Sequence, residues 1–282
     1  MKTISKVFSC ILAFSSLLGN VEGQNIYRIW YDKPASYWEE ALPIGNGRIA
    51  AMVFGNPQLE QIQLNEETVS AGSPYQNYNE EAKTALPEMR RLIFEGKYEE
   101  AQNMAATKIL SQVGNEMPYQ TVGRLNIRYP DHKKVNNYYR DLDISNAVAV
   151  TRYEVDGVEF TEETFASFTD QLVIRHIKSS KPGAINCELF FNTPMRDPKR
   201  SIYGKKGLRL EGITHGSRYF PGKVHYCADL DVKNKGGEVT MANDTLLSVQ
   251  GASELTLYIS MATNFVNYKD ISGDPYQRNK TY

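Results

Sequence analysis

The sequence predicts a mainly β protein: a large antiparallel β-sandwich with a small two-helix insert at about residues 79–110. Three observations predict this fold class. Short runs of strand-favouring residues alternate apolar and polar side chains along most of the chain. Tight-turn pairs such as Asp156-Gly157 separate these runs, and such a pair is typical of an antiparallel hairpin. Between 79 and 110 the apolar residues instead recur at helical spacing.

The expected strands lie on both sides of the insert. They are 26–31, 48–54, 59–64, 123–129, 138–143, 148–155, 158–165, 171–178, 184–192, 223–233, 238–241, 245–250 and 254–263. Many short strands joined by tight turns indicate a sandwich rather than a parallel α/β sheet.

The insert reads as two helices. Asn79 is a good N-cap, and apolar residues recur at helical spacing from 82 to 93. Pro87 is expected to break or restart this helix, because proline removes a backbone donor. Gly96 ends it, and a second helix is expected at 97–110.

The first residues predict a targeting segment. Lys2 and Lys6 precede an apolar run at 7–18 that is too short to span a bilayer, and small residues follow at Val21 and Gly23. We therefore expect residues 1–23 to be a signal peptide. The protein would be exported, to the periplasm or the extracellular space.

Two cysteines remain after such a signal. Cys187 falls on the apolar side of its predicted strand, whereas Cys227 falls on the other side of its own. We therefore expect two free thiols rather than a disulfide.

Charge and motifs exclude several functions. The formal net charge of -1 gives no basic field for nucleic acid or for an anionic membrane. The sequence has no zinc, EF-hand or P-loop motif, so no metal and no cofactor is expected. His176 alternates with apolar residues on its strand and reads as a packed histidine.

No catalytic motif is present. There is no nucleophile elbow, and sequence spacing alone cannot identify a pair of carboxylates that would flank a glycosidic bond. The segment 38–48 stands out because it joins an indole to a glycine turn. It reads either as a rigid turn supported by Trp38 or as a sugar-binding rim made of Trp38, Asn46 and Arg48.

Six segments match motifs of one known family in the family's order. They are WEEALPIGNGR at 38–48, LNEET at 64–68, the segment 90–101 with FEGKY, YRDLD at 139–143, FASFTDQ at 165–171 and ATNF at 262–265. The set resembles glycoside hydrolase family 95, which contains α-L-fucosidases and some α-L-galactosidases. The resemblance covers nearly all of the chain beyond the signal.

The resemblance implies a layout. Residues 24–265 would be the N-terminal β-sandwich domain, and 266–282 would begin a linker toward an (α/α)6 catalytic barrel that lies outside this chain. The family's inverting mechanism uses a glutamic acid and an activated water, and it requires well-separated carboxyl groups. Those residues belong to the barrel, so no catalytic residue is expected in this chain.

The resemblance also suggests a function and a site. The parent would remove terminal L-fucose from fucosylated oligosaccharides or polysaccharides, and the sandwich would support the barrel. Candidates for the substrate rim or the domain interface are Trp38, Asn46, Arg48, Asn65 and Glu66. The alternatives are a stand-alone carbohydrate-binding module without catalysis and an α-L-galactosidase parent.

Overall fold

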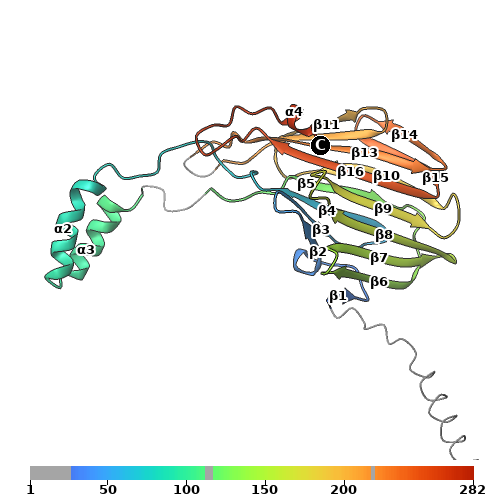
Figure 1. Cartoon of the computed structure of the whole chain (residues 1–282), viewed down its shortest axis with the longest axis horizontal. Coiled ribbons are helices and arrows are strands. Elements are labelled where there is room, and N and C mark those ends of the chain that lie inside the picture. Colours follow the sequence, from blue (N-terminus) through green and yellow to red (C-terminus); the bar gives the residue numbers. More distant parts are fainter. Residues whose placement is uncertain (1–26, 112–116, 217–219) are drawn as a thin grey trace, which may run out of the picture.

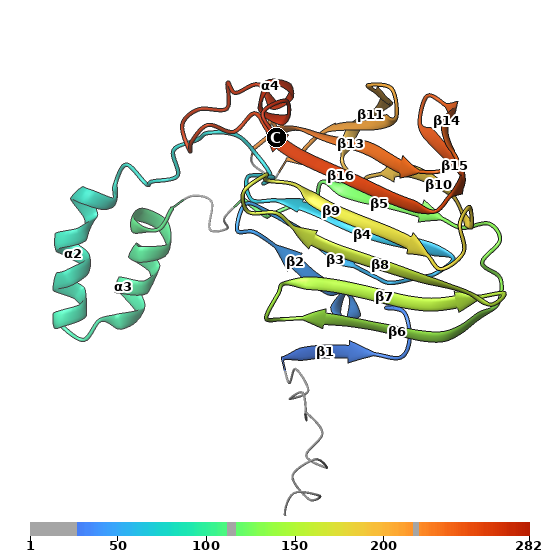
Figure 2. The ribbon, with the colours of Figure 1, turned by 45° about the vertical axis from the view of Figure 1, so that its right-hand side comes forward.

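Two antiparallel sheets face each other in the computed structural model, which describes residues 27–111, 117–216 and 220–282 (Figure 1). The nine-stranded sheet has the order β1 (Arg28–Tyr31), β6 (Val135–Asp143), β7 (Val148–Val155), β8 (Val158–Ala166), β9 (Val173–Ser179), β16 (Glu254–Thr263), β13 (His225–Lys235), β12 (Gly207–Ile213) and β11 (Arg196–Tyr203). The seven-stranded sheet has the order β14 (Glu238–Asn243), β15 (Leu246–Ala252), β10 (Ile185–Asn192), β5 (Gly123–Arg128), β4 (Leu59–Glu66), β3 (Ile49–Val53) and β2 (Leu42–Gly45). The predicted fold class is confirmed, and Figure 2 shows the nine-stranded sheet from its outer side.

The alternation seen in the sequence forms the core between the sheets. On β16, Leu255, Leu257 and Ile259 are fully buried, and on β10 the buried set includes Cys187 and Leu189. The predicted limits 148–155 and 254–263 match β7 and β16. The Asp156-Gly157 pair has positive φ at both residues, as the predicted hairpin turn between β7 and β8 requires.

Three strands escaped the sequence prediction, and two of them are edge strands. β2 contains Pro43, and β11 contains Pro198 at an irregularity in its pairing with β12. Edges tolerate proline because one side of the strand needs no ladder donor. β11 is also largely exposed, so it lacks the apolar alternation by which strands are recognised. On β12, Leu208 and Leu210 do alternate, and this signal was missed.

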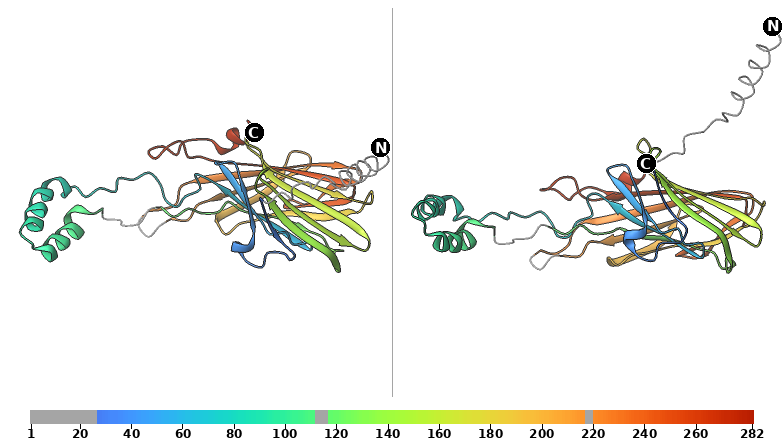
Figure 3. Two further views of the ribbon diagram at one scale, coloured as in Figure 1. Left: turned by 60° about the horizontal axis from the view of Figure 1, so that its bottom comes forward. Right: turned by 90° about the horizontal axis from the view of Figure 1, so that it is seen from below.

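The insert is a helical arm that stands away from the sandwich (Figures 1 and 3). It consists of α2 (Ala82–Phe94), α3 (Tyr98–Met104) and a π-helical turn η2 (Ala105–Ile109). The expected break at Pro87 is wrong, because α2 runs through it. The proline costs one hydrogen bond, while packing of α2 against α3 and η2 maintains the helix.

The segment after β16 packs on the nine-stranded sheet. A short helix α4 (Pro275–Asn279) contacts β13 and β16, and Asp274 caps it. The buried Asn279 amide donates to the carbonyl of Cys227 and to Asp229 Oδ2. The sequence analysis missed this helix, although Asp274 followed by Pro275 is a typical helix start. A linker at 266–282 toward another domain stays a prediction.

Both cysteines are free, as predicted, and both are buried. Cys187 faces the core, and Cys227 lies on the outer face, near α4. Burial raises the pKa of both thiols well above the usual range, so both are kept protonated. The His176 ring packs on the sheet with Nδ1 3.1 Å from Thr256 Oγ1.

The predicted signal peptide lies outside the described residues. None of the helices in the described ranges combines the length and the apolar composition of a membrane-spanning segment. Within the same ranges, no group of three or more His, Cys, Asp or Glu side chains could hold a metal ion.

Candidate functional site

Trp38 lies on a short loop that the interior of the sandwich holds in place. It begins the 3-10 turn η1 (Trp38–Glu40), between β1 and β2, and it is half exposed. The fully buried Arg140 donates from Nε to the Lys33 carbonyl (2.8 Å) and from Nη1 to the Glu40 carbonyl (2.7 Å). These bonds fix both ends of the loop, so the indole is presented on a rigid support.

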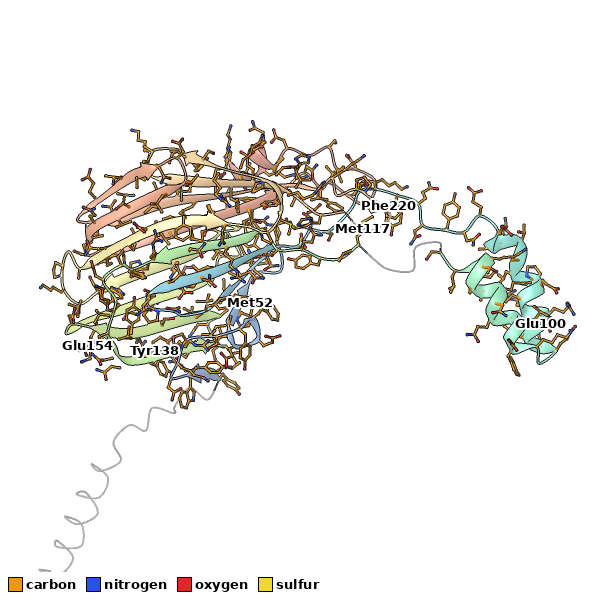
Figure 4. The ribbon with its side chains drawn as sticks, turned by 180° about the vertical axis from the view of Figure 1, so that it is seen from behind. Met52, Glu100, Met117, Tyr138, Glu154 and Phe220 are labelled. Carbon is orange, nitrogen blue, oxygen red and sulfur yellow. The ribbon has the colours of Figure 1, made fainter. Side chains whose placement is uncertain are left out.

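The indole borders a groove on the outer face of the seven-stranded sheet. The groove has a volume of about 490 Å³ and crosses the ends of β2, β3 and β4. Its lining includes Trp38, Met52, Asn65 and Tyr119. Figure 4 labels Met52 beside these strands. Two of the predicted candidates, Trp38 and Asn65, therefore line one hollow.

Asn46 shapes the turn between β2 and β3. Its Oδ1 accepts the backbone N–H groups of Arg48 (3.0 Å) and Ile49 (2.9 Å), and its Nδ2 donates to the Ser167 carbonyl (2.8 Å). Gly47 has a φ of +96°, a conformation that glycine adopts without steric cost. The turn is thus fixed from within and also tied to the loop that follows β8.

Arg48 connects the two sheets. Its Nε donates to Gln171 Oε1 (2.6 Å), its Nη2 to the Gln171 carbonyl (3.1 Å) and its Nη1 to the Met261 carbonyl on β16 (2.8 Å). The ring of Tyr282 lies over the guanidinium, 4.4 Å from its carbon to the ring centroid. These contacts occupy the guanidinium on several sides, so Arg48 acts as a clamp between the sheets.

Glu66 completes this end of the sandwich. Its Oε1 lies 3.6 Å from Arg48 Nη1, and its Oε2 accepts from the Thr68 N–H (2.8 Å) and hydroxyl (2.6 Å). Thr68 also hydrogen-bonds Thr263 of the opposite sheet. Burial raises the pKa of the Glu66 carboxyl, although the bonds from Thr68 oppose the shift.

A second cavity lies where the arm leaves the sandwich. It has a volume of about 660 Å³ and is lined mainly by apolar and hydroxyl side chains, among them Thr68, Tyr75, Phe265 and Tyr268. Tyr75 packs on Phe220 with ring centroids 4.0 Å apart. Figure 4 shows Phe220 and Met117 together at this neck.

The structure therefore divides the five candidates into two groups. Asn46, Arg48 and Glu66 form the clamp, whereas Trp38 and Asn65 line the outer groove. The sequence analysis missed Gln171 and Tyr282 as partners of Arg48. Gln171 ends the FASFTDQ segment, so that motif held a usable signal, whereas nothing marked Tyr282.

The sequence assigns the chain to a family whose position in a longer protein agrees with the sandwich fold. It matches the family described as "Glycosyl hydrolase family 65, N-terminal domain" over residues 29–268, and it belongs to that family. The expectation of an N-terminal sandwich domain of a glycoside hydrolase is thereby confirmed.

The chain is also similar to individual proteins that are named as α-fucosidases. The chain is 31% identical over 271 residues to alpha-L-fucosidase 2 of Arabidopsis thaliana, a match that covers 87% of this chain and 31% of the relative. It is 22% identical over 272 residues to "Probable alpha-fucosidase A" of Aspergillus oryzae, covering 92% of this chain and 36% of the relative. The chain thus spans about a third of the length of these relatives.

Proposed function

We propose that this chain is the N-terminal sandwich of an exported α-L-fucosidase-like glycosidase, and that it supports a catalytic barrel outside the chain. The observation that carries the proposal is the similarity to alpha-L-fucosidase 2 along 87% of the chain. In the proposed reaction a glutamic acid protonates the leaving oxygen while an activated water attacks the anomeric carbon from the opposite face. Both groups would belong to the barrel, and L-fucose would be released from a fucosylated glycan.

The clamp supports the structural part of this role. Arg48, Asn46 and Glu66 hold the β2–β3 turn against the opposite sheet, so one end of the sandwich is rigid. A rigid end is what a neighbouring domain requires if catalytic groups are to be held in place.

Two measurements test the proposal. The purified chain 24–282 is expected to release no L-fucose from 2′-fucosyllactose, and release by this chain would overturn the assignment of catalysis to a barrel. In the second, residues 27–282 replace the matching third of the Arabidopsis enzyme. This chimera is expected to retain fucose release. If it folds, as judged by circular dichroism, and lacks activity, the supporting role is wrong.

Export is part of the proposal and rests on the pattern of residues 1–23. N-terminal sequencing of the protein recovered outside the cytoplasm is expected to begin near Gln24. Recovery of the intact N-terminus from the cytoplasm would contradict it.

A further inference from the structure

We propose that the outer groove bordered by Trp38 and Tyr119 binds a neutral pyranose ring of an oligosaccharide. The site is separate from the clamp at Arg48, and it requires no catalysis by this chain. The inference therefore goes beyond the proposed function, and only the choice of a fucosylated probe rests on it.

Two half-exposed aromatic rings border the groove. Trp38 is 50% exposed and Tyr119 is 53% exposed, and both line the groove. Large exposed rings beside a hollow can stack on the apolar C–H face of a sugar. This stacking removes apolar surface of both partners from water.

Two carboxamides lie on the floor of the groove. Gln63 and Asn65 are two residues apart on β4, so both point outward with Cα atoms about 7 Å apart. This spacing is comparable with the width of one sugar ring. The Gln63 side chain lines the groove. It makes no hydrogen bond within the described ranges, so its donor and acceptor are free for hydroxyl groups.

Small residues keep the floor shallow. Ala50 pairs with both Gly45 and Asn65 across the strands. A Cβ atom at Gly45 would lie 3.2 Å from Ala50 Cβ and 3.1 Å from the Ile49 carbonyl oxygen, so a larger residue there would disturb the floor. A flat ring can therefore lie between the walls.

The lining also indicates a neutral ligand. None of the described residues that line the groove carries a charge; the polar ones are amides and hydroxyls. A phosphate, sulfate or uronate would find no cation there to compensate the loss of its hydration. Neutral sugars carry no such cost.

Contacts within the chain hold both walls of the groove in place. Arg140 fixes the carbonyls at both ends of the Trp38 loop, and Ala35, Ala41 and Phe54 form a small core beneath it with Met52. The Tyr119 hydroxyl donates to the Glu66 carbonyl (3.1 Å). Because both walls are held before binding, little ordering entropy would be lost on binding.

Intrinsic fluorescence tests the inference directly, since Trp30 and Trp38 are the only tryptophans in the chain. In Trp30→Phe, the emission comes from Trp38 alone. Titration with 2′-fucosyllactose is expected to give a saturable shift of that emission. In calorimetric titrations of the otherwise unchanged chain, Trp38→Ala is expected to weaken binding at least about tenfold, and Gln63→Ala about fivefold. Gln250→Ala, an exposed glutamine on the outer face of the same sheet, is the matched control and should change nothing.

Each outcome decides a separate point. Absence of a saturable shift with a native circular dichroism spectrum overturns the inference, as does binding that survives Trp38→Ala and Gln63→Ala. Equal binding of lactose and 2′-fucosyllactose supports a pyranose site that does not read fucose, and this result would leave the fucosidase proposal to the chimera. If the groove binds no sugar and Trp38 becomes shielded in the active chimera, the groove is instead a domain interface.

Discussion

Two arginine–glutamate centres connect the sheets, and they differ in how fully they are enclosed. Arg175 has a side chain that is 0% exposed and pairs with Glu162 and, at 3.4 Å, with Glu60. Arg48 has a side chain that is 18% exposed and lies 3.6 Å from Glu66. Arg175 thus binds two buried carboxylates, whereas Arg48 binds mainly carbonyl oxygens and an amide.

The comparison shows that residue type and burial alone do not identify a functional site. Around Arg175, the hydroxyls of Tyr129 and Tyr153 donate to Glu162, and Thr164 accepts from the arginine. The charges are therefore paired inside the core, although Arg175 Nε and Glu60 Oε2 make no hydrogen bond of their own within the described residues. Around Arg48 the partners come from loops and strand ends, which a neighbouring domain could contact. Enclosure therefore favours a structural role for the first centre and leaves the second open to a functional one.

The largest expected effect is at the enclosed centre. Arg175→Met should lower the free energy of unfolding by about 3–5 kcal/mol, because Glu162 and Glu60 would remain buried without their cation. Urea unfolding gives the difference. Arg128→Met is the control, since its partner Glu188 is at the surface and its loss should cost below about 1 kcal/mol. Equal losses of unfolding free energy in the two variants would show that enclosure does not make the Arg175 centre more important for stability than a surface ion pair.

A smaller loss is expected at the clamp. Arg48→Lys should lower the free energy of unfolding by about 1–3 kcal/mol, because an ammonium cannot serve Gln171 and the Met261 carbonyl together. Tyr282→Ala, which removes only the ring above the guanidinium, should cost less than about 1 kcal/mol. A lysine variant as stable as the parent would show that the clamp contributes nothing to stability.

Glu66→Gln should change the pH dependence more than the stability itself. Burial raises the folded-state pKa of this carboxyl above its ordinary value of 4.5, so the parent binds an extra proton on folding and loses stability as pH rises through that folded pKa. The glutamine variant lacks this loss. The check is the difference in unfolding free energy between acidic and neutral pH, compared in both proteins.

His132, which lies beside the Arg175 centre, should make the unfolding free energy depend on pH in the opposite direction. Its ring stacks on Tyr129, with centroids 4.4 Å apart, and burial lowers its pKa from 6.5. The unfolded chain therefore takes up the proton first, and stability falls as pH drops below that value. His132→Phe should flatten this part of the pH profile. A profile unchanged by the substitution would show that the ring is not protonated on unfolding in this range.

The sequence predicted the fold well for two reasons. Alternation of apolar and polar residues indicates which face of a strand is buried, and turn pairs indicate where a strand ends. It failed where burial was one-sided or weak, as on the exposed edge strand β11. In the site, the turn of Asn46 and Gly47 followed from local chemistry. The separation of Trp38 from Arg48 could not be predicted, because it depends on which face of the sheet each residue occupies.

The helical arm has a consequence for how such a protein can change over time. β4 and β5 are direct neighbours in the sheet, and the two legs of the arm keep pairing beyond them, through Ala71 and Pro118 and through Val69 and Gln120. The strand register is therefore set before the arm begins. Gly72 and Tyr75 still contact the sandwich, through Lys223 and Phe220. The helices α2 and α3 can therefore lengthen or shorten among related proteins without shifting the paired strands.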